Sequence, residues 1–97
     1  MDFDSFRKSL AHEAPPEGLT SALEALWWDG KGDWHQAHEH AQEREDGPGM
    51  NVHAYLHRKE GDRSNANYWY RRAGVTASEQ TLDAEWEELV RRFLERL

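Results

Sequence analysis

Histidine is the residue type whose number and spacing in this chain point most directly to chemistry. The sequence has six histidines among 97 residues and no cysteine. His53 and His57 are four residues apart, so on a helix their imidazoles would lie on the same face. Neutral imidazole nitrogens are common ligands of zinc and other divalent transition metals. A metal site is therefore one hypothesis for this pair, provided that another element supplies a third ligand.

His38 is the candidate third ligand, because it lies on the predicted helix that precedes the one carrying His53 and His57. Two consecutive helices joined by a short turn run antiparallel, which would bring the three imidazoles together. The alternative is that His38 only packs, because Ala37 and Ala41 place it within an apolar stripe, and the chain would then hold no cofactor. The metal hypothesis comprises the ligands His38, His53 and His57, with Glu39, Gln42 or Glu60 as a fourth group.

The familiar catalytic signatures are incomplete or missing in this sequence. Residues His38 to Gln42 approach the zinc-protease pattern H-E-x-x-H, but glutamine stands where the second histidine is required. Without cysteine the chain excludes disulfides, thiolate metal sites and a cysteine nucleophile. No phosphate-binding loop and no nucleophile elbow is present. The sequence thus predicts no catalytic residue, and a non-enzymatic function is the favoured interpretation.

A second candidate site is a stretch rich in tyrosine and arginine between residues 53 and 72. Tyrosine, tryptophan and arginine dominate protein-binding hot spots, and guanidinium groups bind carboxylates and phosphates. The leading hypothesis is therefore an interaction module whose partner is a protein or an acidic peptide segment. The alternative is structural, since two of the arginines would also stabilise the carboxyl end of their own helix. The predicted binding residues are His53, Tyr55, His57, Arg58, Tyr68, Arg71 and Arg72.

The charge distribution favours an acidic partner for this stretch. The formal net charge of the chain is −7, yet residues 47–75 carry five basic against two acidic side chains. The overall acidity argues against nucleic acid as the partner, because phosphate-driven binding needs a basic footprint. The first residues are acidic and no long apolar run occurs, so we expect a cytoplasmic protein that does not bind membranes.

The elements that must position these residues are all predicted to be helices. Apolar residues recur at helical spacing, and no segment shows the alternation of a half-buried strand. Gly47-Pro48-Gly49 is expected to break the chain between two hairpins, and Thr76 with Glu79 to cap the last helix. The predicted parts of this one domain, residues 1–97, are a short N-terminal helix around Phe3 to Leu10, hairpin units at about 19–46 and 50–74, and a C-terminal helix at about 78–97.

The two predicted hairpins correspond to each other at an offset of 29 residues. The dipeptide Gly32-Asp33 corresponds to Gly61-Asp62, and in both units an alanine stands at the fifth position after the glycine. A small side chain suits a place where two helices approach to about 8–10 Å. The correspondence predicts one helical hairpin that occurs twice.

The second unit, from Gly61 to Gly74, resembles a Sel1-like or tetratricopeptide repeat, in which a Gly-Asp turn precedes a helix of the form x-x-A-x-x-W-Y-x-x-A. The period of 29 residues differs from the ~34 of tetratricopeptide repeats. The segment from His53 to Ala73 is also similar to the core of a group of small bacterial proteins, which implies no activity. The resemblance to helical-repeat proteins implies stacked hairpins whose first helices line a concave face. This face would carry some of the residues His53, Tyr55 and His57.

Two hairpins alone bury too little apolar surface, so the terminal helices are expected to cover them. One stripe of the C-terminal helix keeps a 4-3-4 spacing and consists of Leu82, Trp86, Leu89 and Phe93. This stripe either docks on the hairpins as a cap or pairs with a second copy to form a homodimer. The tryptophans expected in the core are Trp27, Trp34, Trp69 and Trp86, with Trp28 facing outward.

Overall fold

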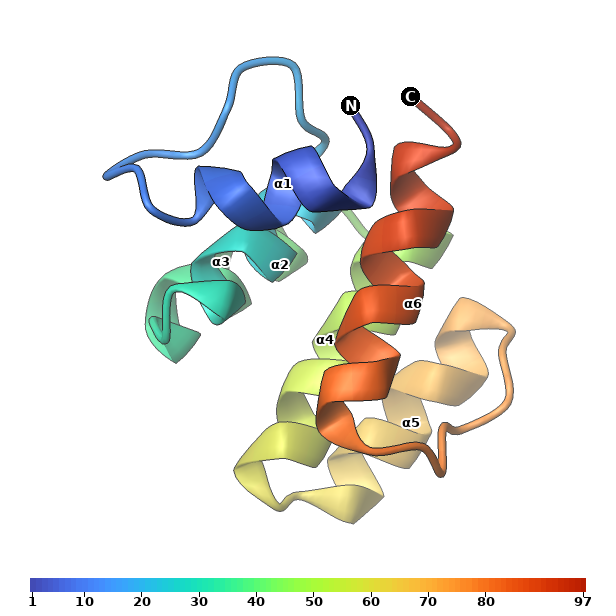
Figure 1. Ribbon diagram of the computed structural model, residues 1–97. Coiled ribbons are helices and arrows are strands. Elements are labelled where there is room, and N and C mark those ends of the chain that lie inside the picture. The colour runs from blue at the N-terminus through green and yellow to red at the C-terminus, as the bar shows by residue number, and fades with distance from the viewer.

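The computed structural model describes residues 1–97 and consists of six helices without a β-strand, which confirms the predicted all-α fold (Figure 1). The helices are α1 (Phe3–Ser9), α2 (Ser21–Gly30), α3 (Trp34–Gln42), α4 (Gly47–Glu60), α5 (Arg63–Ala73) and α6 (Leu82–Leu94). α2 pairs with α3 and α4 with α5 as two hairpins, while α1 and α6 cover them. No helix combines the length and the apolar character needed to cross a membrane.

The hairpin turns form where the sequence predicts them. Gly32 and Gly61 have φ angles of 86° and 94°, in the left-handed region that a side chain disfavours. Asp33 and Asp62 then cap the following helices, each accepting a hydrogen bond from the backbone N–H three residues on, at 3.1 and 3.2 Å. Each glycine–aspartate pair thus ends one helix and starts the next.

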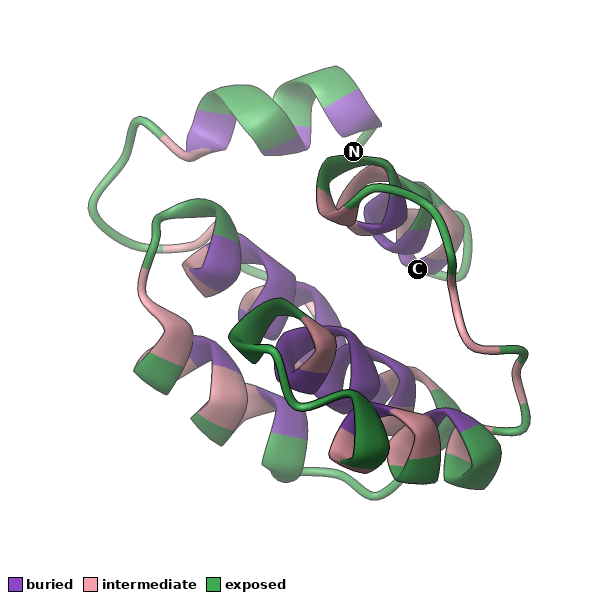
Figure 2. Ribbon diagram, turned by 90° about the horizontal axis from the view of Figure 1, so that it is seen from below, coloured by how far each residue is buried: buried purple, intermediate pink, exposed green.

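Small residues set the spacing inside each hairpin. Ala25 and Ala37 are fully buried between α2 and α3, as are Ala54 and Ala66 between α4 and α5. Because α3 also packs against α4, the hairpins lie side by side, and α4 is surrounded by other helices (Figure 2). Every residue from Asn51 to His57 is buried as a result.

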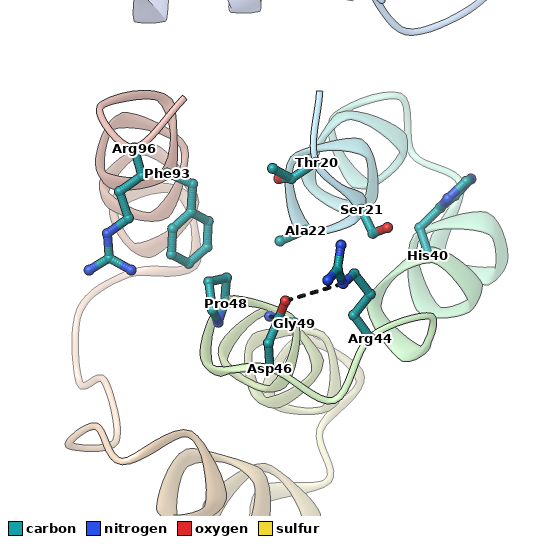
Figure 3. Close-up of a pocket in the computed structure, with 10 residues that line it drawn as sticks. All are labelled: Thr20, Ser21, Ala22, His40, Arg44, Asp46, Pro48, Gly49, Phe93 and Arg96. Atoms are coloured by element: carbon teal, nitrogen blue, oxygen red, sulfur yellow. Dashed lines mark hydrogen bonds and ion pairs between the residues drawn. The ribbon is translucent and has the colours of Figure 1, made fainter. Parts of the chain in front are cut away.

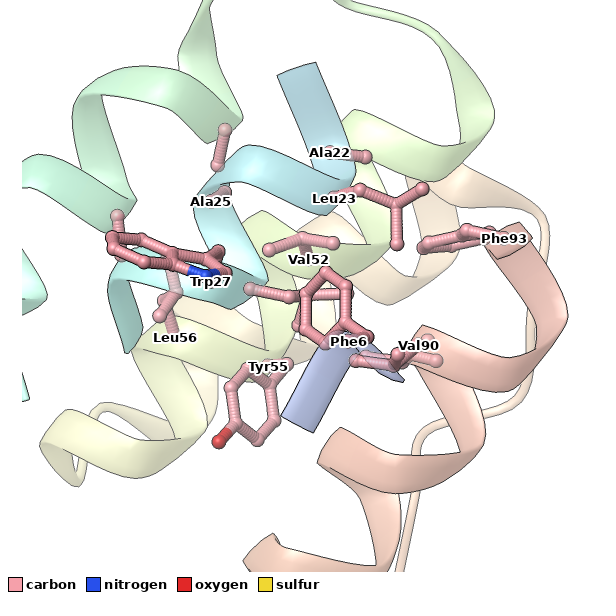
Figure 4. Close-up of a cluster of buried hydrophobic side chains, with 14 of the residues drawn as sticks. Phe6, Ala22, Leu23, Ala25, Trp27, Val52, Tyr55, Leu56, Val90 and Phe93 are labelled. Atoms are coloured by element: carbon pink, nitrogen blue, oxygen red, sulfur yellow. The ribbon is translucent and has the colours of Figure 1, made fainter. Parts of the chain in front are cut away.

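The terminal helices close the main core, in which Phe6 of α1 and Val90 of α6 lie next to each other in the same buried cluster as Trp27 of α2 (Figure 4). All three side chains are fully buried. The indole N–H of Trp86 donates to the carbonyl of Leu26 at 2.9 Å and fixes α6 on α2. The stripe of α6, predicted either as a cap or as a dimer seam, therefore packs within the chain.

α4 begins earlier than predicted. Asp46 caps the helix by accepting a hydrogen bond from the N–H of Gly49 at 2.8 Å. Pro48 occupies the first turn, where the helix needs no N–H. The Gly-Pro-Gly segment is therefore the start of α4 rather than a break before it.

The start of α6 and the burial of the tryptophans also differ from the predictions. Thr81 caps α6 by accepting from the N–H of Ala84 at 3.1 Å, so the predicted pair of Thr76 and Glu79 does not cap it. Trp27 alone among the tryptophans is fully buried, whereas the other four are half-buried against the core.

Two buried carboxylates, Asp29 and Glu85, join helices through the same arrangement, and we call them the carboxylate anchors. Asp29, at the end of α2, accepts a hydrogen bond from the hydroxyl of Tyr55 at 2.7 Å and pairs with Lys59 at 2.8 Å. Burial and the negative charge of Asp29 raise the pKa of Tyr55, so the hydroxyl keeps its proton and donates it to the carboxylate. This anchor holds α2 against α4.

Glu85 holds α6 against α4 and α5. Its carboxylate accepts a hydrogen bond from the hydroxyl of Tyr70 at 2.6 Å and pairs with Arg58 at 2.8 Å. Burial and the bond to Glu85 raise the pKa of Tyr70. Because each anchor combines a hydroxyl donor with a cation, the loss of hydration of the carboxylate is compensated inside the protein.

Candidate metal centre

Three histidines, His38 of α3 with His53 and His57 of α4, meet between these helices, and we call them the histidine cluster. One ring nitrogen of each lies within 4.8 Å of one from both of the others. Nε2 of His38 and Nε2 of His53 are 2.9 Å apart. His53 and His57 are only 7% and 8% exposed, and His38 is half-buried. The structure thus brings together the three residues of the metal hypothesis.

Two tryptophans enclose the histidine cluster. The indole of Trp34 stacks on His38 with the ring centroids 4.8 Å apart, and that of Trp69 stacks on His53 at 4.1 Å. Trp34 is itself fixed, because its N–H donates to the carbonyl of Leu56 at 3.1 Å. The imidazoles of His38 and His53 are therefore each packed face to face against an indole.

Polar side chains contact the outer nitrogens of two of the imidazoles. Glu60 Oε1 lies 3.1 Å from Nδ1 of His57. A carboxylate only accepts, so this contact places the proton on Nδ1 and leaves a lone pair on Nε2. Gln42 Nε2 lies 3.1 Å from Nδ1 of His38. An amide that turns over offers its oxygen instead, so Gln42 fits either tautomer of this ring.

The surroundings keep two of the three imidazoles, those of His38 and His53, neutral. Burial, reinforced by the neighbouring imidazoles of His38 and His57, lowers the pKa of His53 to about 4. Burial and the neighbouring imidazole of His57 also lower the pKa of His38. At neutral pH these two rings therefore carry no charge, and neutral imidazole is the form that binds metals.

The three predicted fourth groups take different places. Gln42 and Glu60 contact imidazoles of the cluster from outside, as groups that orient metal ligands do. Glu39 instead pairs with the exposed His35 at 3.1 Å. None of the three completes the cluster as a direct fourth ligand, so a bound ion would keep one coordination position for another group.

Two residues of the predicted binding surface lie in the interior. Tyr55 is buried and bonded to Asp29, and Arg58 pairs with Glu85 and donates to the backbone carbonyl of Gln80. The prediction of a concave face on the first helices overlooks that α6 and α5 cover α4. His53 and His57 are buried for the same reason, and they belong to the histidine cluster rather than to a surface.

The other predicted binding residues form an exposed patch on α5. Tyr68 is 45% exposed, and the guanidinium of Arg72 lies 5.8 Å from the centre of its ring and 5.2 Å from that of Trp69. Arg72 also lies 3.9 Å from Glu45 of the loop before α4. Arg71 is exposed next to this patch. We call Tyr68, Trp69 and Arg72 the α5 patch.

Two small hollows lie near the ends of α3 and α4. One of about 110 Å³ borders His53 and Trp69, and Met50 also lines it. Met50 precedes His53 by one helical turn, and no motif in the sequence marks it as a functional residue. Figure 3 shows the other hollow, of about 100 Å³, at the N-terminal ends of α2 and α4, where Arg44 pairs with Asp46 at 3.6 Å. This second hollow does not reach the histidine cluster.

The fold and the cluster together define an all-helical domain with a candidate three-histidine metal centre. Comparison of the chain with family models, with curated proteins and with solved structures found no match. The function therefore has to be argued from the geometry of the site.

Proposed function

We propose that this protein binds a divalent transition-metal ion, with zinc as the reference ion, through His38, His53 and His57. The convergence of the three imidazoles supports the proposal. Ligand nitrogens around a tetrahedral zinc ion are about 3.3 Å apart, given zinc–nitrogen bonds of about 2.0–2.1 Å. The observed separations, from 2.9 Å up to at most 4.8 Å, bracket this value. Small rotations of the rings suffice to admit an ion.

The hydrogen bonds around the cluster favour a metal over packing alone. The contact between His38 and His53 uses one nitrogen of each ring, and one of the two must carry the hydrogen. Nε2 of His57 keeps its lone pair, and no side chain of the protein donates to it. A cluster with a spare acceptor is suited to a metal ion, which takes lone pairs from all three rings.

Glu60 gives the site a feature that metal ligands commonly have. A metal-bound histidine usually donates its other N–H to a carboxylate, which fixes the ring and makes the ligating nitrogen more basic. Glu60 occupies this position on His57, at 3.1 Å from Nδ1. The open fourth position is typical of sites that exchange a ligand rather than of closed structural sites.

Zinc titration of the untagged protein tests the proposal. We expect one Zn²⁺ per chain, measured by competition with a chromophoric chelator and by elemental analysis after desalting. His53→Ala should abolish binding, whereas His35→Ala should not, because His35 is an exposed histidine of the same helix as His38. Folded wild-type protein that binds no Zn²⁺, or equal binding by both variants, would contradict the proposal.

A second candidate function, recognition of an acidic peptide segment, is supported by the α5 patch. An arginine stacked over two aromatic rings on an exposed helix has the composition of a binding hot spot. Exchange of Arg71 and Arg72 for glutamate should abolish binding of a glutamate-rich peptide, measured by fluorescence anisotropy, while helical content stays unchanged. Arg91→Glu on α6 is the matched control, and unchanged binding by the double variant would exclude this function.

A further inference from the structure

α4 carries a row of metal-ligating side chains that extends beyond the histidine cluster. Met50, His53, His57 and Glu60 follow one another at intervals of three, four and three residues, so they share one face of the helix. Glu60 orients His57 at one end of the row. At the other end Met50 and His53 line the same small hollow beside Trp69. The row therefore presents a thioether next to the imidazoles.

We infer that Met50 is a fourth ligand and that the same site binds monovalent copper, an inference that rests on the proposed function. Thioether sulfur is a soft ligand that selects Cu(I), whereas imidazole suits zinc and copper alike. The methionine side chain has three rotatable bonds and is unbranched, so from one turn away its sulfur is able to reach the ion. The hollow of about 110 Å³ leaves room for this movement.

The surroundings of the cluster favour a single positive charge. His53 and His57 are buried, and neither an imidazole nor a thioether brings a negative charge to a bound ion. Transfer of a charge into such surroundings is costly unless it is compensated, and the cost rises steeply with the charge of the ion. The carboxylate of Glu60 contacts His57 rather than the centre of the cluster. The single charge of Cu(I) is therefore compatible with this set of uncharged ligand types.

The two indoles also stabilise a bound cation. An aromatic face attracts positive charge, and Trp34 and Trp69 stack directly on the imidazoles that would share the charge of the ion. Met50 is the residue that distinguishes Cu(I) binding from Zn²⁺ binding at this site, because a zinc site needs no thioether ligand.

The composition of the chain makes the role of Met50 easy to isolate. The chain contains no cysteine and two methionines. The other methionine, Met1, is 57% exposed and lines a different hollow, with Arg91 and Leu94 of α6 and without any residue of the histidine cluster. Any sulfur bound to copper at the histidine cluster must therefore come from Met50.

Cu(I) and Zn²⁺ titrations of the full-length wild type and of Met50→Leu test the inference. Leucine has a similar volume, so the packing beside His53 and Trp69 is retained. Under anaerobic, reducing conditions, competition with a chromophoric Cu(I) chelator should show one Cu(I) per wild-type chain. We expect Met50→Leu to weaken Cu(I) binding about tenfold or more, while Zn²⁺ affinity changes less than about twofold.

X-ray absorption spectroscopy of the copper-loaded wild type supplies a measurement that does not depend on the variant. The spectrum should contain one sulfur neighbour together with nitrogen neighbours, and the sulfur should disappear in Met50→Leu. Equal Cu(I) affinity in both proteins, or a wild-type spectrum without sulfur, would overturn the inference while Zn²⁺ binding upholds the proposed function. Wild-type protein that binds neither ion would overturn both.

Discussion

The carboxylate anchors and the histidine cluster are both buried polar groups at helix contacts, but their partners differ. Asp29 and Glu85 each have a tyrosine hydroxyl and a cation within 2.8 Å. The three histidines face one another, without a cation or a carboxylate between them. Nothing from outside is needed to complete the anchors, whereas the cluster retains spare lone pairs. This contrast separates polar groups that hold the fold from polar groups available to a ligand.

The largest effect is expected where an anchor is broken. Glu85→Ala leaves the half-buried Arg58 without its counter-charge and the hydroxyl of Tyr70 without its acceptor. We expect the free energy of unfolding to fall by about 3 kcal/mol, measured by urea denaturation. Glu88→Ala is the matched control, because Glu88 pairs with Arg92 at the surface and should cost less than about 1 kcal/mol. Similar losses of unfolding free energy in both variants would show that the buried ion pair of Glu85 contributes no more to stability than the surface ion pair of Glu88.

Zinc should stabilise the protein only through the histidine cluster. An ion that binds the folded state alone adds about 2.7 kcal/mol when its free concentration is a hundred times the dissociation constant. Urea denaturation with and without Zn²⁺ should show this gain in the wild type and in His35→Ala, but not in His53→Ala. A gain that persists in His53→Ala would place the ion elsewhere on the chain.

Acid should weaken the metal-free protein through the cluster. An unfolded histidine titrates near pH 6.5, whereas burial and the neighbouring imidazoles lower the pKa of folded His53 to about 4. Between these values the unfolded state binds more protons, so the free energy of unfolding falls as the pH falls. Above about pH 7 both states are neutral and this contribution vanishes.

The pH effect is measured as the difference between wild type and His53→Leu from about pH 7.5 down to about pH 5. The carboxylates titrate alike in both proteins, so they cancel in the difference. The wild type should lose more stability than His53→Leu over this range. Parallel curves would mean that His53 becomes protonated within the folded protein as readily as in the unfolded chain.

The parts of the fold with local signals were predictable from the sequence. The glycine at each turn supplies the positive φ and the following aspartate supplies the cap, so both hairpins follow from a few neighbouring residues. The meeting of His38 with His53 and His57 follows in turn, because these histidines lie on consecutive antiparallel helices. Two short-range rules were therefore enough to bring the cluster together.

Features that depend on distant segments were not predictable. Tyr55 and Arg58 belong to types that favour binding surfaces, but α2 and α6 supply the buried partners Asp29 and Glu85. These partners are 26 and 27 residues away along the chain, and no periodicity encodes such pairings. Met50 was missed for a different reason, since it already lay on the predicted helix with His53, but a single methionine has no spacing pattern that marks it as a ligand.

The smallest expected effect gives the most direct test of the contrast between the two regions. His53→Leu removes an imidazole whose only hydrogen bond is to another imidazole, and leucine fills much of the same space beside Trp69. A buried polar pair replaced by apolar side chains is often neutral for stability. At about pH 8, above the pKa of about 6.5 of an ordinary histidine, we expect the metal-free variant to unfold within about 1 kcal/mol of the wild type. The partner that stays behind, His38, is half-buried and is able to turn its Nε2 to water.

A loss of more than about 2 kcal/mol in metal-free His53→Leu would be the size expected of an anchor rather than of a ligand site. The contrast between the carboxylate anchors and the histidine cluster would then fail, because the histidines would hold α3 on α4 as Glu85 holds α6. Unchanged stability of His53→Leu together with lost zinc binding would instead mark the cluster as a ligand site. The cluster would then contribute little to the fold in the absence of metal, and the burial of His53 and His57 would be explained by the ion that they bind.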